Sequence, residues 1–144
     1  MSGAPVRACA GAHRGAAIAL IALAVAACGA PPPDLFEVRR SGQGTNARVD
    51  LVVSDGGSVT CNGREHALNG DLLLRARKVA RDLAAQAELG LQLPPGRGTV
   101  LSYRVRLEPG TVSFSDTSPH QPRPFLALQA LTKDITEDVC GLGR

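Results

Sequence analysis

Apolar and polar residues alternate over several short stretches of this chain, a pattern typical of strands with one buried face. In residues 35–40, Phe36 and Val38 share one side while Glu37 and Arg39 share the other. Two pairs of alternating stretches flank a tight-turn sequence, Asp55-Gly56-Gly57 in the first pair and Pro109-Gly110, typical of a type II turn, in the second. We therefore predict strands over residues 35–40, 49–53, 59–61, 101–107 and 112–115.

Two longer segments have apolar residues every three or four positions, which indicates amphipathic helices. Over residues 71–89 the apolar positions are Leu72, Ala76, Val79, Leu83 and Ala87. Over residues 123–139 they are Phe125, Leu128, Leu131, Ile135 and Val139.

The order β-ββ-α-ββ-α predicts an α+β fold, an antiparallel sheet of about five strands with both helices packed on one face. Residues 35–144 would form this single domain. The opposite face of the sheet would stay open and polar, with Arg104 and Arg106 projecting from it. Such a face is a common place to bind a partner.

The first 27 residues read as a signal peptide. Arg7 and Arg14 precede an apolar run at residues 16–27, which is too short to span a membrane. The run ends in Val25-Ala26-Ala27-Cys28, which resembles the bacterial lipoprotein signal. That resemblance implies cleavage before Cys28, a diacylglycerol on its thiol, and anchoring at the extracytoplasmic face of the cell membrane. The alternative is an ordinary secretory signal that is cut slightly later.

Residues 28–34 would form a stiff tether, because Pro31, Pro32 and Pro33 favour polyproline II. The strong preference for Arg over Lys indicates a GC-rich genome, such as that of an actinobacterium.

Four cysteines are present. Cys9 leaves with the leader and Cys28 carries the lipid, so Cys61 and Cys140 remain. Outside the cytoplasm a disulfide between them is expected. The alternatives are two free buried thiols or a pair of metal ligands.

Composition and charge indicate a soluble globular domain without nucleic-acid binding. The chain is 44% hydrophobic and 20% charged, its net charge is +3, and no basic run is interleaved with aromatics. On one side of the first helix lie the basic residues Arg75, Arg77, Lys78 and Arg81. They form either a solvated face or a contact with anionic lipid or cell-wall polymer.

No catalytic or phosphate-binding motif is present, and we expect no enzyme activity, cofactor or metal. His66 and His120 would lie in different loops. We expect Asp71 to pair with Arg75 along the first helix. Asp134 and Asp138, one turn apart on the last helix, are either solvated or a pair of catalytic carboxylates.

Several short motifs, in their order along the chain, resemble the emfourin family, small inhibitors of thermolysin-like metalloproteases. They are Val38-Arg39-Arg40-Ser41-Gly42, Pro94-Pro95, Tyr103-Arg104-Val105, Gly110 and Val112-Ser113-Phe114-Ser115-Asp116. The resemblance implies the same fold and an exposed inhibitory loop. The candidate partner-contact residues are Ser41, Gly42, Gln43, Gly44 and Thr45.

The sequence thus predicts a membrane-anchored, non-enzymatic protein-binding module, whose partner is a secreted protease or a component of the cell envelope. Emfourin-like inhibition is the alternative, and carriage of a small ligand stays open. The Gly-rich segment at residues 41–47 is either a flexible connector or the loop that contacts the partner.

Overall fold

The computed structural model describes residues 34–143, so the predicted leader, the lipidation site Cys28 and the tether up to Pro33 lie outside the described residues. The strands are β1 (Asp34–Gly42), β2 (Val49–Ser54), β3 (Ser58–Cys61), β4 (Arg64–Ala67), β5 (Leu101–Arg106) and β6 (Thr111–Ser115). The helices are α2 (Gly70–Glu88), α3 (Arg123–Asp134) and the π-helical turn η2 (Ile135–Val139).

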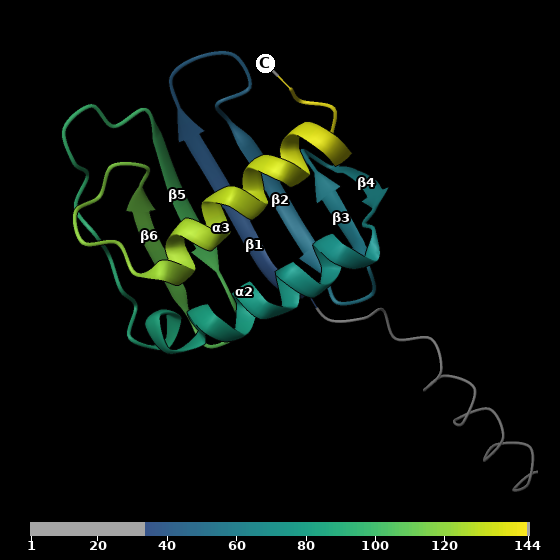
Figure 1. Cartoon of the computed structure of the whole chain (residues 1–144), viewed down its shortest axis with the longest axis horizontal. Helices are drawn as coiled ribbons and strands as arrows, with labels where there is room; N and C mark the ends of the chain where they lie inside the picture. The colour runs from purple at the N-terminus through teal and green to yellow at the C-terminus, as the bar shows by residue number, and fades with distance from the viewer. Residues whose placement is uncertain (1–33, 144) are drawn as a thin grey trace, which may run out of the picture. The chain divides into compact units, whose positions relative to one another are not determined.

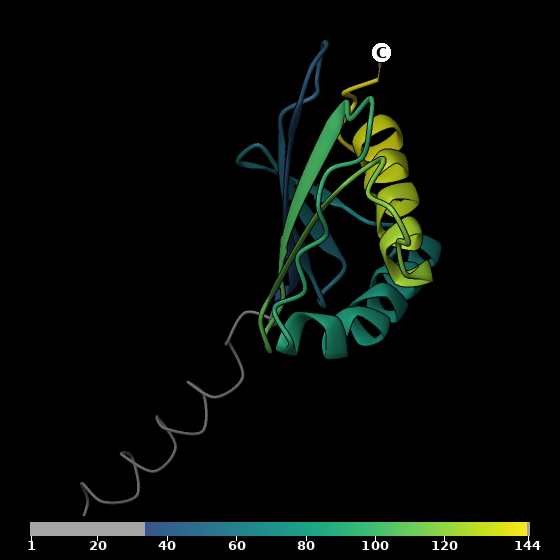
Figure 2. The ribbon, with the colours of Figure 1, turned by 90° about the vertical axis from the view of Figure 1, so that its left-hand side faces the viewer.

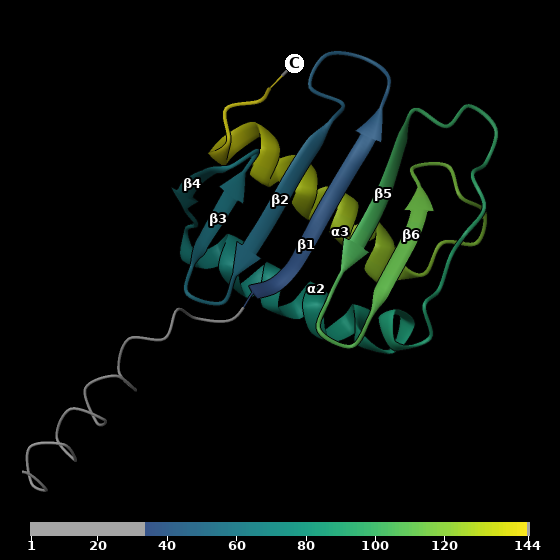
Figure 3. The ribbon, with the colours of Figure 1, turned by 180° about the vertical axis from the view of Figure 1, so that it is seen from behind.

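The six strands form one antiparallel sheet in the order β4-β3-β2-β1-β5-β6. The first strand in sequence is therefore central, with β2 on one side and β5 on the other (Figures 1 and 3). In this order β1 is the one strand that lies between the β2–β3 hairpin and the β5–β6 hairpin.

Both helices cover the same face of the sheet, which confirms the predicted α+β architecture (Figure 2). The core lies between these two layers. Every predicted apolar position of α2 is buried, as are Phe125, Leu128, Leu131 and Ile135 of the last helix. Three aromatic rings lie together in the core: Phe114 is stacked on Tyr103, with ring centroids 5.0 Å apart, and is tilted against Phe125, with centroids 4.6 Å apart.

The sheet has one more strand than expected, because the chain turns again directly after Cys61. Asn62 and Gly63 both have positive φ, +47° and +85°, as a two-residue hairpin turn requires. The turn adds β4, so His66 lies in a strand opposite Val59 and not in a loop as predicted.

The last helix changes its winding near its end. The prediction was one helix to residue 139, but α3 ends at Asp134 and continues as η2. The Cys140 N–H donates to the Ile135 carbonyl at 2.9 Å, a bond that spans five residues instead of four. The Cys140 side chain is partly buried against the core.

Cys140 forms a disulfide with Cys61 of β3, as predicted, with their Cα atoms 6.0 Å apart. This bond excludes the alternatives of free thiols and of a metal pair. It connects the first hairpin to the last turn of the chain, across 79 residues of sequence.

Candidate functional site

Among residues 34–143, no helix or loop covers the face of the sheet opposite the helices (Figure 3). This face carries polar side chains from several strands. We call it the open face. Its central residues are Glu37, Arg39, Ser41, Asp50, Ser102, Arg104, Arg106 and Ser113. Two hollows of about 540 and 290 Å³ lie on it, and both are lined by Arg39 and Arg104.

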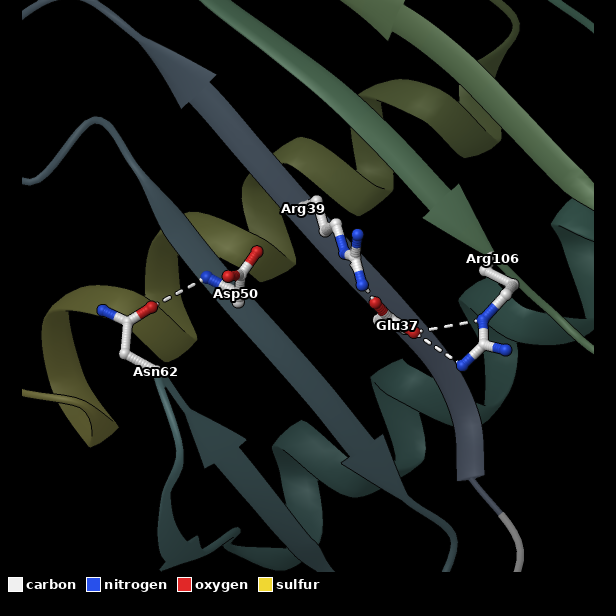
Figure 4. A network of polar contacts seen from close by, with 5 residues as sticks. All are labelled: Glu37, Arg39, Asp50, Asn62 and Arg106. Atoms are coloured by element: carbon white, nitrogen blue, oxygen red, sulfur yellow. Dashed lines mark hydrogen bonds and ion pairs between the residues drawn. The ribbon is translucent and has the colours of Figure 1, made fainter.

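Glu37 lies between two arginines of the open face (Figure 4). Arg106 of β5 donates to one carboxylate oxygen through both Nε (3.0 Å) and a terminal nitrogen (2.6 Å). Arg39 donates its Nε to the other oxygen at 2.8 Å. Partial burial alone would raise the pKa of the Glu37 carboxyl, but the hydrogen bonds and charges of Arg106 and Arg39 outweigh it and hold the pKa below its usual value.

Near the Glu37 ion pairs lie two more arginines that pair with no carboxylate within residues 34–143. Arg104 lies directly opposite Arg39 in the β1–β5 pairing, and Arg48 lines the larger hollow with them. Within residues 34–143, neither Arg48 nor Arg104 forms an ion pair or a side-chain hydrogen bond. The open face therefore has guanidinium groups that its own acids do not neutralise.

The basic side of α2 is different, because most of its cations are already paired. Arg77 donates to the Asp55 carboxylate at 2.6 Å, and Lys78 pairs with Asp82 at 2.5 Å along the helix. This side of α2 therefore has less unpaired positive charge than the open face, which makes it the weaker candidate for a partner contact.

The predicted Asp71–Arg75 pair does not form. Arg75 instead reaches the Asp134 carboxylate of α3 at 2.7 Å, because the two helices pack side by side and bring that carboxylate within reach. Asp134 is thus held by Arg75 in an ion pair between the helices.

The predicted contact loop begins later than expected. Ser41 and Gly42 are the last residues of β1, paired with Ser102 and Leu101, and only Gln43, Gly44 and Thr45 leave the sheet. All five predicted residues are exposed. A Cβ on Gly42 would lie 2.1 Å from the Val100 carbonyl oxygen, so this glycine is required where β1 approaches the start of β5.

The loop is fixed from below by Arg40, whose side chain is on the core side and only 9% exposed. Its guanidinium donates to the backbone carbonyls of Asn46 (2.8 Å) and Ala47 (3.2 Å). The Asn46 amide in turn donates to the carbonyls of Leu142 and Gly143. These bonds brace the end of the segment, at Asn46 and Ala47.

A groove of about 690 Å³ runs beneath this loop along one side of α3. Polar groups line it, among them Arg40, Tyr103, Asp116 and Lys133. Burial raises the pKa of the Tyr103 phenol, and the neighbouring Arg40 offsets part of that shift. The Asp116 carboxylate accepts the N–H groups of Val100 and Leu101 and so holds the start of β5.

The two histidines do not come together. His66 is in β4, and His120 is in an exposed turn with φ +55°. In the described part of the chain, no group of three His, Cys, Asp or Glu residues is placed to hold a metal ion. Neither α2 nor α3 is long and apolar enough to cross a bilayer, and this statement too covers residues 34–143 alone.

The sequence predicted that Arg104 and Arg106 lie on the open face, but it did not predict the other charged residues that lie beside them. Arg39, Arg48 and Asp50 join it because β1 separates β2 from β5, a pairing order that alternation within each strand does not reveal. Compared with known protein families, curated protein sequences and solved structures, the chain shows no match.

Proposed function

We propose that this protein is a membrane-anchored extracytoplasmic lipoprotein, and that its folded domain is a non-enzymatic module that binds a protein partner on the open face. The leader supports the anchor, since Val25-Ala26-Ala27-Cys28 has the residues that lipid attachment requires. Two acyl chains are sufficient for stable membrane attachment, where one is marginal.

One observation carries the binding proposal. The helices cover one side of the sheet only, while the other side has two hollows lined by exposed arginines. Arg48 and Arg104 on this face form no ion pair within residues 34–143, and both line the larger hollow. Surfaces of this kind, held rigid by the strands around them, are suited to docking.

Photocrosslinking in the bacterium that makes the protein tests the binding proposal. A benzoyl-phenylalanine at Ser102, an exposed position on the open face, should give a discrete adduct with a second protein. The matched control is Ala85, an exposed small residue on α2. Adducts from Ala85 alone, or from neither position in a protein that is folded and present in the envelope, would overturn the proposal.

The anchor has its own test. Cys28→Ser should abolish incorporation of a labelled fatty acid, because serine has no thiol to carry the diacylglycerol. Cys9→Ser, which alters a leader cysteine, serves as the control and should leave the labelling unchanged. Fatty-acid labelling that persists in Cys28→Ser would contradict lipidation at this residue.

Emfourin-like inhibition of a thermolysin-like metalloprotease is the second candidate function. The observation that favours it is the braced exposure of Gln43, Gly44 and Thr45, because a contact loop that is already ordered loses little entropy on binding. Ser41 and Gly42 would extend that contact along the end of β1.

Titration of such a protease with the oxidised protein tests this function. Activity should fall to zero near a 1:1 ratio, and the inhibitor should remain intact. Thr45→Arg at the loop should weaken inhibition, whereas Ala85→Arg on the helix side should not. Full protease activity at a large excess of folded protein would exclude inhibition of this protease class.

A further inference from the structure

We propose that the partner's contact on the open face is an acidic protein segment, whose carboxylates bind between Arg39, Arg48 and Arg104. This inference rests on the proposed binding function and specifies its chemistry. It follows from which cations are satisfied within the fold and which are not.

The first step is the opposition of two like charges. Arg39 and Arg104 are direct cross-strand neighbours in the β1–β5 pairing, where Cβ atoms are about 5 Å apart. Like charges at such a pair destabilise a sheet. Within residues 34–143 Arg104 forms no ion pair, and the one carboxylate bonded to this pair is Glu37, through Arg39. Unfavourable local arrangements, such as two like charges opposite each other on neighbouring strands, are expected at functional sites.

The second step is that the open face already binds one carboxylate. Glu37 accepts from two nitrogens of Arg106 at one oxygen and from the Nε of Arg39 at the other, and charge-assisted bonds of this kind are stronger than neutral ones. Arg39 uses only its Nε for this contact. Within residues 34–143 its two terminal nitrogens make no hydrogen bond, and Arg104 is its cross-strand neighbour, so the two arginines together can bind a second carboxylate.

Two acidic residues among the arginines favour a protein segment over a polymer with uniform negative charge. Asp50 lines the larger hollow among the arginines, and Glu37 lines the smaller one. These acids repel a phosphate polymer or an anionic lipid surface, which present negative charge at every position. A polypeptide with spaced carboxylates avoids both acids and can donate its own N–H groups to them.

Binding of an acidic peptide to the full-length protein in a neutral detergent tests this inference. The probe is a fluorescein-labelled peptide of alternating Glu and Gly, and its control has Gln in place of Glu. Fluorescence anisotropy should show binding of the Glu peptide only, weaker in about 0.2 M salt than in about 0.05 M salt because the charges are exposed. Removing both unpaired cations, with Arg48→Gln and Arg104→Gln together, should weaken binding by about tenfold.

The matched control removes two other arginines, Arg81→Gln and Arg123→Gln together. Both are exposed, outside the sheet and without an ion pair in the described chain, and the change in net charge is the same. This variant should bind within twofold of the unmodified protein. Arg104→Lys keeps the charge but loses the fork, so it should bind between the unmodified protein and Arg104→Gln.

Three results would overturn the inference. The first is an equal loss of binding in both double variants, which would mean attraction by net charge alone. The second is Arg104-dependent binding of polyphosphate or of phosphatidylglycerol vesicles without binding of the peptide. The third is an open-face crosslink at Ser102 with no peptide binding, which would leave the proposed function standing and reject an acidic partner.

Discussion

Glu37 is the residue on which the charge arrangement of the open face depends. It holds Arg39 and Arg106 in place, and its side chain is only 16% exposed while those of both arginines are more than two-thirds exposed. A carboxylate so enclosed by cations contributes to stability in its charged form. Its protonation state should therefore be measurable in the unfolding of the protein.

Glu37→Gln should lower the free energy of unfolding at pH 7 by about 1 kcal/mol. Because the folded pKa of Glu37 is lowered, the stabilisation is fully present above the ordinary glutamate pKa of about 4.3 and is lost as the pH falls through the folded value. The difference between the unmodified protein and the variant should thus shrink below about pH 4. Urea unfolding at a series of pH values measures it.

Glu65→Gln is the control for this prediction, since Glu65 is exposed on β4 and forms no ion pair within residues 34–143. It should change stability little at any pH. A constant difference between Glu37→Gln and the unmodified protein from pH 7 down to pH 2 would contradict a role for the charged carboxylate.

At the scale of elements, the second hairpin is fixed to α2 by a close approach at its turn. The turn is where the sequence predicted it, but Gly110 does not adopt a positive φ, so the type II assignment is wrong. The glycine is needed for space instead. A Cβ at this position would lie 2.1 Å from the Ala87 carbonyl oxygen at the end of α2.

Gly110→Ala should therefore destabilise the protein by about 1–3 kcal/mol, the usual cost of forcing packed elements apart. Gly70→Ala is the matched control, because Gly70 has open space around it at the start of α2. That variant should be neutral or slightly stabilising. Equal stability of the two variants in urea unfolding would show that the hairpin turn and α2 do not pack as described.

Elements that depend on local patterns could be predicted, and those that depend on distant partners could not. The spacing of Leu72, Ala76, Val79, Leu83 and Ala87 identified the buried side of α2 residue by residue. The turn sequence Asn62-Gly63 was a usable signal for β4, but that strand is short, charged and at the edge of the sheet, so it lacks an apolar alternation.

The π-helical turn had no signal in the sequence. It ends directly at the disulfide, since Cys140 follows its last residue and bonds to Cys61. Likewise the neighbourhood of Arg39 and Arg104 follows from the strand order, which no pattern within β1 or β5 contains. The core was therefore predictable from the sequence, whereas the site required the topology.

At the scale of the whole molecule, α3 crosses the helical face from the β6 side of the sheet toward β3, and the disulfide fixes its far end (Figure 1). One edge of the sheet is protected separately. The chain at residues 91–93 bonds to Ser113 of β6, with Leu93 donating at 2.9 Å and Ser113 donating back to Leu91 at 3.1 Å. The opposite edge, β4, is short, and the disulfide on β3 is its nearest covalent support.

Loss of the disulfide should consequently cost much of the stability of the domain. Closing a loop of 79 residues removes unfolded-state entropy worth about 4.5 kcal/mol, against a total of about 5–15 kcal/mol for a typical domain. The double variant Cys61→Ser and Cys140→Ser, compared with the oxidised protein in urea, should show a loss of this size. Reduction of the unmodified protein with dithiothreitol should give the same loss, and hydrogen exchange should rise first in β3, β4 and η2. A reduced protein within about 1 kcal/mol of the oxidised one would mean that packing of α3 alone holds this side of the sheet.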